Sequence, residues 1–265
     1  MKKINLRDGT PIYCLNSIEA NVLDDHIQSY LNYDIGIKDG DTIVDIGANI
    51  GVFGIRLSQL FQNINIYAFE PIPEIYDVLH INAQKSLNKN FKTYMLGISD
   101  KKKEIQFTYF PNSPALSTSK PQIWEQNKKN FHAAVEGSIV NAPKKFWWTK
   151  FIPKIFIPLI AKYLTYKKKI ISNKVLSLQD FIDEKNILEI HLLKIDCEGE
   201  ELNVLRGIGE NQWKIINCII MEVHNIDNNI KIAKSLLVNN GFKNIMITKE
   251  KGLEKANLVN IFASK

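Results

Sequence analysis

The chain has 265 residues, 45% hydrophobic and 23% charged, which is the balance of an ordinary globular protein and excludes a disordered or collagen-like chain. Its three cysteines have no metal-ligand spacing, which argues against a zinc site or a disulfide framework. The first residues lack the apolar core of a signal peptide, and no apolar run is long enough to span a membrane, so we expect a cytoplasmic protein.

The net charge of +6 is unevenly distributed along the chain. Residues 111–172 carry eleven lysines against two glutamates, whereas the remainder has slightly more acidic than basic residues. The basic character therefore belongs to one segment. No recognisable nucleic-acid-binding module accompanies these lysines, so we expect no nucleic-acid partner.

Residues 1–40 predict a β-hairpin followed by a helix. Asp8 and Gly9 are a pair typical of two-residue hairpin turns, and short apolar runs flank them on both sides. Apolar residues at helical spacing then continue from Glu19 to Leu31. We expect this hairpin and helix to cap a larger domain that begins at residue 41.

A strand, a glycine-containing turn and a helix follow one another directly in the next stretch. The apolar run Thr42 to Ile46 includes Asp45, and the turn after it carries Gly47, Asn49 and Gly51. This is the first unit of a doubly wound α/β sheet, in which ligands bind at the carboxyl ends of the strands. Glycines allow close approach of the backbone to a ligand, and a carboxylate at the strand end favours a ligand with a positively charged group.

The second expected strand, Asn65 to Glu70, ends in a carboxylate that can accept hydrogen bonds from both hydroxyls of a ribose. A ribose together with an amino-acid zwitterion indicates S-adenosylmethionine as the ligand. The alternative is a nicotinamide-dependent dehydrogenase. Its usual G-x-G-x-x-G spacing differs from the glycine spacing of this chain.

A third strand is expected from Phe91 to Ile98, and the regular pattern then breaks at Pro111. Because so long an irregular segment is usually a lid or a small subdomain, we expect residues 111–172 to form an inserted lid over the acceptor. Its aromatic and lysine-rich part, 144–169, admits three interpretations. It could pack on the core as a helical cap, bind an anionic acceptor such as a phosphorylated or nucleotide-linked sugar, or contact an acidic membrane surface.

The last part of the chain supplies four more expected strands. These are Ile190 to Asp196, Cys218 to Val223, Asn244 to Thr248 and Leu258 to Ala263. The near-continuous apolar runs of the first two are typical of parallel strands that are covered on both faces. The expected fold is therefore a doubly wound, mostly parallel, seven-stranded α/β sheet over residues 41–265, with one inserted lid.

Four blocks resemble the FkbM-type S-adenosylmethionine-dependent methyltransferases. They are D-I-G-A-N-I-G-V-F at 45–53, F-E-P-I-P at 69–73, L-L-K-I-D-C-E-G-E-E at 192–201 and M-E-V-H-N at 221–225. The resemblance implies a Rossmann-like class I methyltransferase fold, in which the last two strands form an antiparallel pair. It also implies S-adenosylmethionine as the cofactor and a sugar or polyketide hydroxyl as the acceptor.

The cofactor residues combine the strand-end pattern with this resemblance. The resemblance implies that Ser99 or Asp100 contacts the adenine, although an ordinary turn explains these two residues equally well. The residues assigned to cofactor binding are Asp45, Gly47, Asn49, Gly51, Glu70 and Ser99.

The ends of the fourth and fifth strands carry the candidate catalytic residues. An unactivated hydroxyl is a poor nucleophile at neutral pH, so the acceptor needs a base or a metal ion. We assign His224 as the general base, with Asp196 and Glu222 orienting either the base or the acceptor. Two carboxylates and an imidazole are also a suitable ligand set for a divalent metal, and this alternative stays open.

Other polar residues nearby are expected to have structural roles. Glu198 and Glu201 are expected to begin the following helix and to interact favourably with its dipole. Lys194 is assigned no function, and its amine is expected to reach solvent or a carboxylate. His26 and Tyr30 on the expected first helix fit packing or surface positions better than a site.

The pattern as a whole predicts an O-methyltransferase. We expect it to act on a hydroxyl or a phosphate-type oxygen of a small-molecule or glycan acceptor, such as a sugar, a glycan precursor or a secondary metabolite. Two alternatives stay open, namely an N-methyltransferase and a non-catalytic cofactor-binding scaffold on the same fold. Association with a membrane through residues 144–169 is the open alternative to a purely cytoplasmic location.

Overall fold

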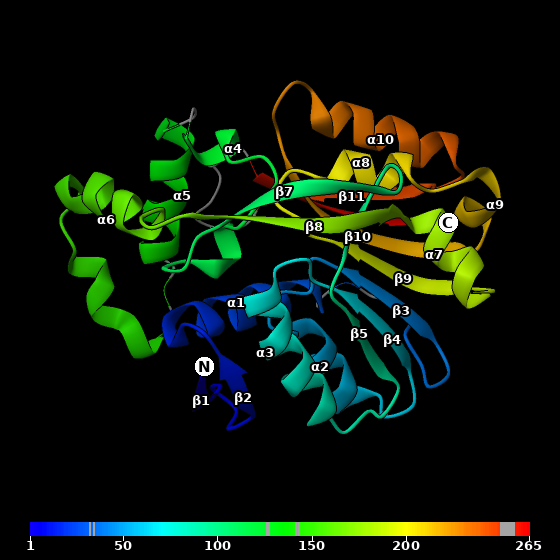
Figure 1. Ribbon diagram of the computed structural model, residues 1–265, viewed down its shortest axis with the longest axis horizontal. Helices are drawn as coiled ribbons and strands as arrows, with labels where there is room; N and C mark the ends of the chain where they lie inside the picture. The colour runs from blue at the N-terminus through cyan, green and yellow to red at the C-terminus, as the bar shows by residue number, and fades with distance from the viewer. Residues whose placement is uncertain (32, 34, 126–127, 141, 143, 250–257) are drawn as a thin grey trace.

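The structure is a computed structural model that describes residues 1–265 apart from 32, 34, 126–127, 141, 143 and 250–257. Its centre is a seven-stranded sheet in the order β11-β12-β10-β9-β3-β4-β5, with a mixture of parallel and antiparallel neighbours (Figure 1). The strands are β3 (Thr42–Ile46), β4 (Asn65–Phe69), β5 (Phe91–Tyr94), β9 (Ile190–Ile195), β10 (Ile216–His224), β11 (Asn244–Thr248) and β12 (Leu258–Ser264).

The predicted doubly wound, mostly parallel sheet is confirmed. Strands β5, β4, β3, β9 and β10 run parallel to one another. At the end of the sheet β12 is antiparallel to both of its neighbours, β10 and β11, and its pairing with β11 is the expected antiparallel pair. The strand order reverses between β3 and β9, because β3 leads to β4 on one side while β9 leads to β10 on the other. The crevice outside such a reversal point is where ligands bind in open α/β sheets.

Helices cover both faces of this sheet, and alternate strand residues supply the two cores. Ile43 and Leu192 pack on the face covered by α1 (Ser17–Tyr30), α2 (Val52–Leu60) and α3 (Pro73–Gln84). Val44 and Leu193, one residue further along the same strands, pack on the opposite face. The helices of that face are α7 (Leu178–Lys185), α8 (Glu201–Arg206), α9 (Glu210–Lys214) and α10 (Asn229–Asn239).

The amino-terminal segment forms the expected hairpin and helix. Strands β1 (Lys2–Asn5) and β2 (Pro11–Cys14) pair in antiparallel register, and α1 follows them. Arg56 of α2 bonds to this segment through Asp24 and Asp8, at 2.7 Å and 2.5 Å. The cap is therefore joined to the sheet domain by a buried ion pair with Asp24 and a partly exposed one with Asp8, as well as by its apolar residues.

The expected third strand is wrong as a single element. β5 ends at Tyr94, and the next residues turn into β6 (Gly97–Ser99), which belongs to a second sheet in the order β6-β8-β7. Gly97 lies so close to Val175 that a Cβ would approach its side chain to 2.9 Å. This contact with a strand almost 80 residues later turns the chain, and the local apolar pattern does not register it.

The lid lies between the two arms of a long hairpin. Strands β7 (Lys103–Tyr109) and β8 (Lys169–Ser177) pair in antiparallel register, so residues 169–172 of the expected insertion belong to β8. The lid has its own small core, which includes Phe110, Trp124 and Phe131. Its helices are η1 (Pro114–Leu116), α4 (Gln122–Glu125), α5 (Lys128–Val140), η2 (Lys144–Phe151), η3 (Lys154–Phe156) and α6 (Ile157–Leu164), and they occupy one end of the molecule (Figure 1).

Candidate active site

A cavity of about 250 Å³ opens at the carboxyl ends of the central parallel strands. The turn after β3, the end of β4, the loop after β9 and the end of β10 all contribute to its wall. The cap helix α1 and the lid close the remaining sides. Among the predicted site residues, those that line it are Gly47, Asn49, Glu70, Asp196 and Glu222.

The turn after β3 requires glycine at its first position. Gly47 has a φ of +74°, and a Cβ there would overlap the carbonyl oxygen of Asp196. Glycine therefore allows the turn to pack against the end of β9, where the strand order reverses. The side-chain oxygen of Asn49 accepts the N–H of Ile50 at 2.8 Å, which keeps the turn in its left-handed conformation.

Glu70 is a buried carboxylate at the end of β4 that faces the cavity. Burial raises the pKa of Glu70 to about 7, against the opposing effect of hydrogen bonds from the backbone N–H groups of Ile72 and Asn49. A carboxylate in this position can bind vicinal hydroxyls, as the sequence predicts for a ribose.

Three predicted cofactor residues do not line the cavity. Asp45 is fully buried within the sheet, and Gly51 is the N-cap of α2 beside Leu79. Ser99 donates its hydroxyl to Glu200 at 3.4 Å and is also buried, so that the neighbouring Gly97 and Ile98 line the cavity in its place.

Asp45 forms an ion pair with Lys194, a residue for which the sequence pattern predicted no function. Lys194 Nζ lies 3.0 Å from Asp45 Oδ1 and 3.6 Å from Asp196 Oδ2, and its side chain is 3% exposed. Burial raises the pKa of Asp45, and the charge of Lys194 opposes that rise. No described residue donates a hydrogen bond to Asp45 Oδ2. The pair joins β3 to β9 beneath the cavity.

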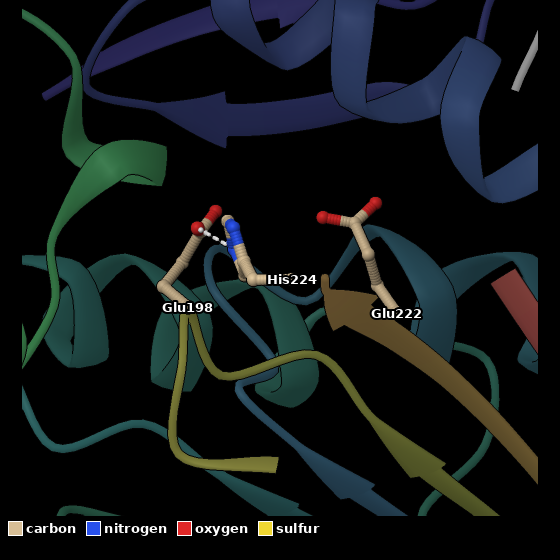
Figure 2. Close-up of side chains that lie close together, drawn as sticks. All are labelled: Glu198, Glu222 and His224. Carbon is tan, nitrogen blue, oxygen red and sulfur yellow. Dashed lines mark hydrogen bonds and ion pairs between the residues drawn. The ribbon is translucent and has the colours of Figure 1, made fainter. Parts of the chain in front are cut away.

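His224 is paired with Glu198, which is not among the catalytic residues that the sequence pattern predicts. His224 Nε2 donates to Glu198 Oε2 at 3.0 Å (Figure 2). Glu198 lines the cavity, whereas His224, although only 4% exposed, is not among the described residues that line it. The group aimed at the cavity is therefore Glu198, with His224 as its partner.

The expectation that Glu198 begins a helix is wrong. Helix α8 starts at Glu201, while Glu198 stands in the preceding loop with a φ of +51°. Glu201 does lie in the first turn, where it accepts the N–H of Gly199 at 2.6 Å. Glu198 follows Asp196 by only two residues, just past the carboxyl end of β9, and this closeness to the predicted strand end was the available signal.

The electrostatic environment of the pair is set by burial and by neighbouring carboxylates. Burial by itself lowers the pKa of His224, but Glu198, Glu201 and Asp196 outweigh it, so the pKa of His224 is raised. Burial raises the pKa of Glu198, and His224 opposes this rise. A carboxylate with a raised pKa is a stronger base than an exposed one.

The base of the lid holds the loop that carries Glu198. Thr118 Oγ1 donates to the carbonyl oxygen of Glu198 at 2.6 Å, and Lys120 Nζ donates to that of Gly199 at 2.7 Å. The ring of Trp124 packs edge-on against His224, with 5.1 Å between ring centroids. The lid therefore positions the Glu198–His224 pair in addition to covering the cavity.

Glu222 lies on the opposite side of His224 from Glu198 (Figure 2) and contacts His26 of helix α1. His26 Nε2 lies 3.5 Å from Glu222 Oε2 and bonds to the hydroxyl of Tyr30 at 2.8 Å. His26 lines the cavity, contrary to its expected packing or surface position, while Tyr30 is buried as a packing residue. The i, i+4 spacing of these two residues on an amphipathic helix was the signal for a shared role.

A divalent cation has a candidate ligand set here. One ligand atom each from Glu198, Glu222 and His224 all lie within 4.8 Å of one another (Figure 2). Oxygen and imidazole ligands suit Mg²⁺, Mn²⁺ or a related ion. Asp196, which the sequence grouped with this cluster, lies on the cavity wall beside Lys194 and is not part of the three-residue set.

Comparison with known proteins places this chain in a family. A family model described as the methyltransferase FkbM domain matches residues 45–244. Methyltransferase sdnD of Sordaria araneosa is 30% identical over 240 residues, which cover 89% of this chain and 86% of that protein. The 31-O-demethyl-FK506 methyltransferase FkbM of Streptomyces tacrolimicus is 25% identical over 245 residues, or 91% and 89% of the two chains. Hexuronic acid methyltransferase AglP of Haloferax volcanii is 23% identical over 187 residues, or 71% and 57%.

Proposed function

The chain belongs to the FkbM methyltransferase family and is an S-adenosylmethionine-dependent methyltransferase, and we propose that it methylates a hydroxyl oxygen. The acceptor class that we propose is a sugar, a glycan precursor or a secondary metabolite. The observation that carries this proposal is the Glu198–His224 pair at the cavity. A neutral amine can attack a methyl group without a base, whereas an unactivated hydroxyl needs one.

The residues present fit S-adenosylmethionine. Glu70 faces the cavity as an acceptor for ribose hydroxyls, and Ile72 and Ile98 supply an apolar wall suited to an adenine. The turn of Gly47 and Asn49 brings backbone close to the same space. When bound there, this cofactor supplies an electrophilic methyl group on its sulfonium sulfur.

In the proposed mechanism Glu198 removes the acceptor proton. Its Oε2 is hydrogen-bonded to His224, so the proton is taken by the other carboxylate oxygen, Oε1. His224 holds the carboxylate in place, and Trp124 packs against the imidazole and excludes water from that side. His224 is thus a positioning residue in this proposal, which changes its expected role as the base itself.

The names of two relatives support an oxygen acceptor. One relative is named for 31-O-demethyl-FK506 and another for hexuronic acid. The acceptor side of the cavity in this chain is formed by the lid residues Ser117, Thr118 and Ser138. The hydroxyls of Ser117 and Ser138 can bond to a polyhydroxylated ligand, whereas that of Thr118 already donates to the carbonyl oxygen of Glu198.

A labelled-methyl screen tests the proposed reaction. The protein is incubated with methyl-labelled S-adenosylmethionine and three acceptor sets: uronic acids and nucleotide-linked sugars, hydroxylated polyketides, and primary amines. Mass spectrometry then locates the label. We expect it on a hydroxyl oxygen of one of the first two sets. Label found only on nitrogen would overturn the proposal in favour of an N-methyltransferase.

The raised pKa of Glu70 predicts pH-dependent nucleoside binding. Below pH 7 the carboxyl is protonated and accepts hydrogen bonds less well, so affinity should fall by about tenfold between about pH 8 and pH 6. A suitable calorimetric probe is 5′-methylthioadenosine, which has the ribose but no group that titrates in this range. Glu70→Gln should bind it more weakly at the higher pH and show no pH dependence. Glu74→Gln, a change at a partly exposed carboxylate in α3, is the matched control. A pH profile in Glu70→Gln like that of the wild type would contradict the role of Glu70.

A bound cation is the second candidate for activating the acceptor, because Glu198, Glu222 and His224 lie within ligand distance of one another. Since Glu198 and His224 already bond to each other, we expect dialysis against a chelator to leave turnover within about twofold of its original rate. A loss that exceeds about tenfold and is restored by Mg²⁺ or Mn²⁺ would replace the carboxylate base with metal activation.

A further inference from the structure

The outer part of the lid exposes an unusual number of large apolar side chains. Seven of them fall within 17 consecutive residues, and each is between 48% and 82% exposed. We call this surface, together with the lysines between these residues, the aromatic–lysine face. Its apolar members are Trp147, Trp148, Phe151, Ile155, Phe156, Leu159 and Tyr163.

The inner side of the same segment already completes the lid core. Ile157 and Ala161 of α6 are buried against the core that α4 and α5 also build. On the opposite side of α6, Leu159 and Tyr163 point outward with Lys162 between them. The helical-cap interpretation of residues 144–169 therefore explains the inner half of α6 and leaves the outer half without a protein partner among the described residues.

The charge of this face is positive throughout. Residues 144–169 contain no aspartate or glutamate, and the exposed lysines include Lys150, Lys154 and Lys162. Lys154 pairs with Glu136 of α5 at 2.5 Å, but the lysine side chain is 82% exposed, so water screens this pair. Two copies of the chain that packed face to face through this surface would bring lysines against lysines. An anionic surface would complement them.

We propose that residues 144–169 bind the protein peripherally to a membrane that contains anionic lipids. Trp147, Trp148 and Phe151 enter the headgroup region, where tryptophan is favoured, and the lysines contact the lipid phosphates. No helix in the described part of the chain is long and apolar enough to cross a bilayer, so the contact is interfacial.

The aromatic–lysine face lies on the same part of the lid that contributes a helix to the cavity wall. Helix α5 lines the cavity through Ala134 and Ser138, and α6 packs against α5. In Figure 1 both helices lie at the left end of the molecule, and the seven-stranded sheet lies to their right. Binding through this face would bring the acceptor side of the enzyme to the membrane. The binding itself does not depend on which atom is methylated.

Vesicle co-sedimentation of the full chain tests the proposal. We expect binding to phosphatidylcholine vesicles with about 30% phosphatidylglycerol, and at least about tenfold weaker binding to pure phosphatidylcholine. Raising NaCl from about 50 mM to about 500 mM should release most of the protein, because salt screens the lysine contacts. Equal binding to both kinds of vesicle, or none to either, would overturn the proposal.

Paired variants test whether vesicle binding depends on the aromatic–lysine face or on exposed apolar and basic side chains in general. Trp147→Ser/Trp148→Ser/Phe151→Ser and Lys150→Glu/Lys162→Glu should each weaken binding to anionic vesicles by at least about tenfold. Controls that are equally exposed elsewhere are Leu60→Ser/Leu87→Ser/Leu188→Ser and Lys231→Glu/Lys234→Glu, which should bind like the wild type. A wild-type dimer in sedimentation equilibrium that the triple aromatic variant converts to monomer, without any vesicle binding, would assign the face to a second copy instead.

Discussion

Replacing Glu198 with glutamine is expected to lower kcat by about 10²- to 10⁴-fold, the usual contribution of a positioned general base. Glutamine keeps the shape of the side chain and can still accept the hydrogen bond from His224 Nε2, which measures 3.0 Å in the wild type. It cannot take up a proton. The rate is measured with the acceptor identified by the labelled-methyl screen, and cofactor binding is measured separately by calorimetry.

Two companion variants make this result specific to the pair. His224→Gln should also lower kcat, but by less than Glu198→Gln, because it removes the partner and leaves the carboxylate. Glu210→Gln, an exposed change in α9, and His80→Gln, an exposed change in α3, should leave kcat within about twofold. If His224→Gln proved far more damaging than Glu198→Gln, His224 would be the base and Glu198 its support.

Replacing Lys194 with methionine is expected to lower the free energy of unfolding by about 3–5 kcal/mol. Methionine fills a similar volume but leaves Asp45 buried with no positive charge beside it, and its Oδ2 already lacks a hydrogen-bond donor among the described residues. Urea-induced unfolding followed by circular dichroism measures the change. Activity alone would not separate this effect from damage to the nearby cavity.

The double variant Lys194→Met/Asp45→Asn distinguishes pairing from packing. It removes the unpaired charge and should recover a large part of the lost free energy of unfolding, because an amide is less costly to bury than a carboxylate. Lys174→Met is the matched control, since this lysine also lies in a strand but is exposed, and it should change stability by less than about 0.5 kcal/mol. A double variant no more stable than Lys194→Met would mean that the lysine acts through packing.

Local patterns were sufficient for most of the fold. The apolar runs of β3, β9 and β10 predicted strands correctly. Both faces of these strands are buried, so nearly every residue in them is apolar. The boundary between β5 and β6 was missed because close packing of Gly97 against Val175 sets it. A contact between residues so far apart in the chain leaves no trace in a window of neighbouring residues.

Local rules also predicted three of the residues that line the cavity, but not the direction of every side chain in the same motif. Gly47, Asn49 and Glu70 face the cavity because the carboxyl ends of neighbouring parallel strands meet at one edge of a sheet. Asp45 belongs to the same motif, yet it is turned into the sheet and held by Lys194. A residue at a strand end can face either the ligand or the interior. The spacing of the motif does not decide between them.

The sequence by itself determined the layered sheet, its glycine-containing turn and the strand ends that carry carboxylates, because each depends on residues that are neighbours in the chain. The tertiary structure alone decided that Glu198 is the partner of His224. Its backbone lies in the left-handed region and is held by Thr118 of the lid, 80 residues earlier. Folding brings these distant segments into contact, and the hydrogen bonds between them fix which side chain reaches the cavity.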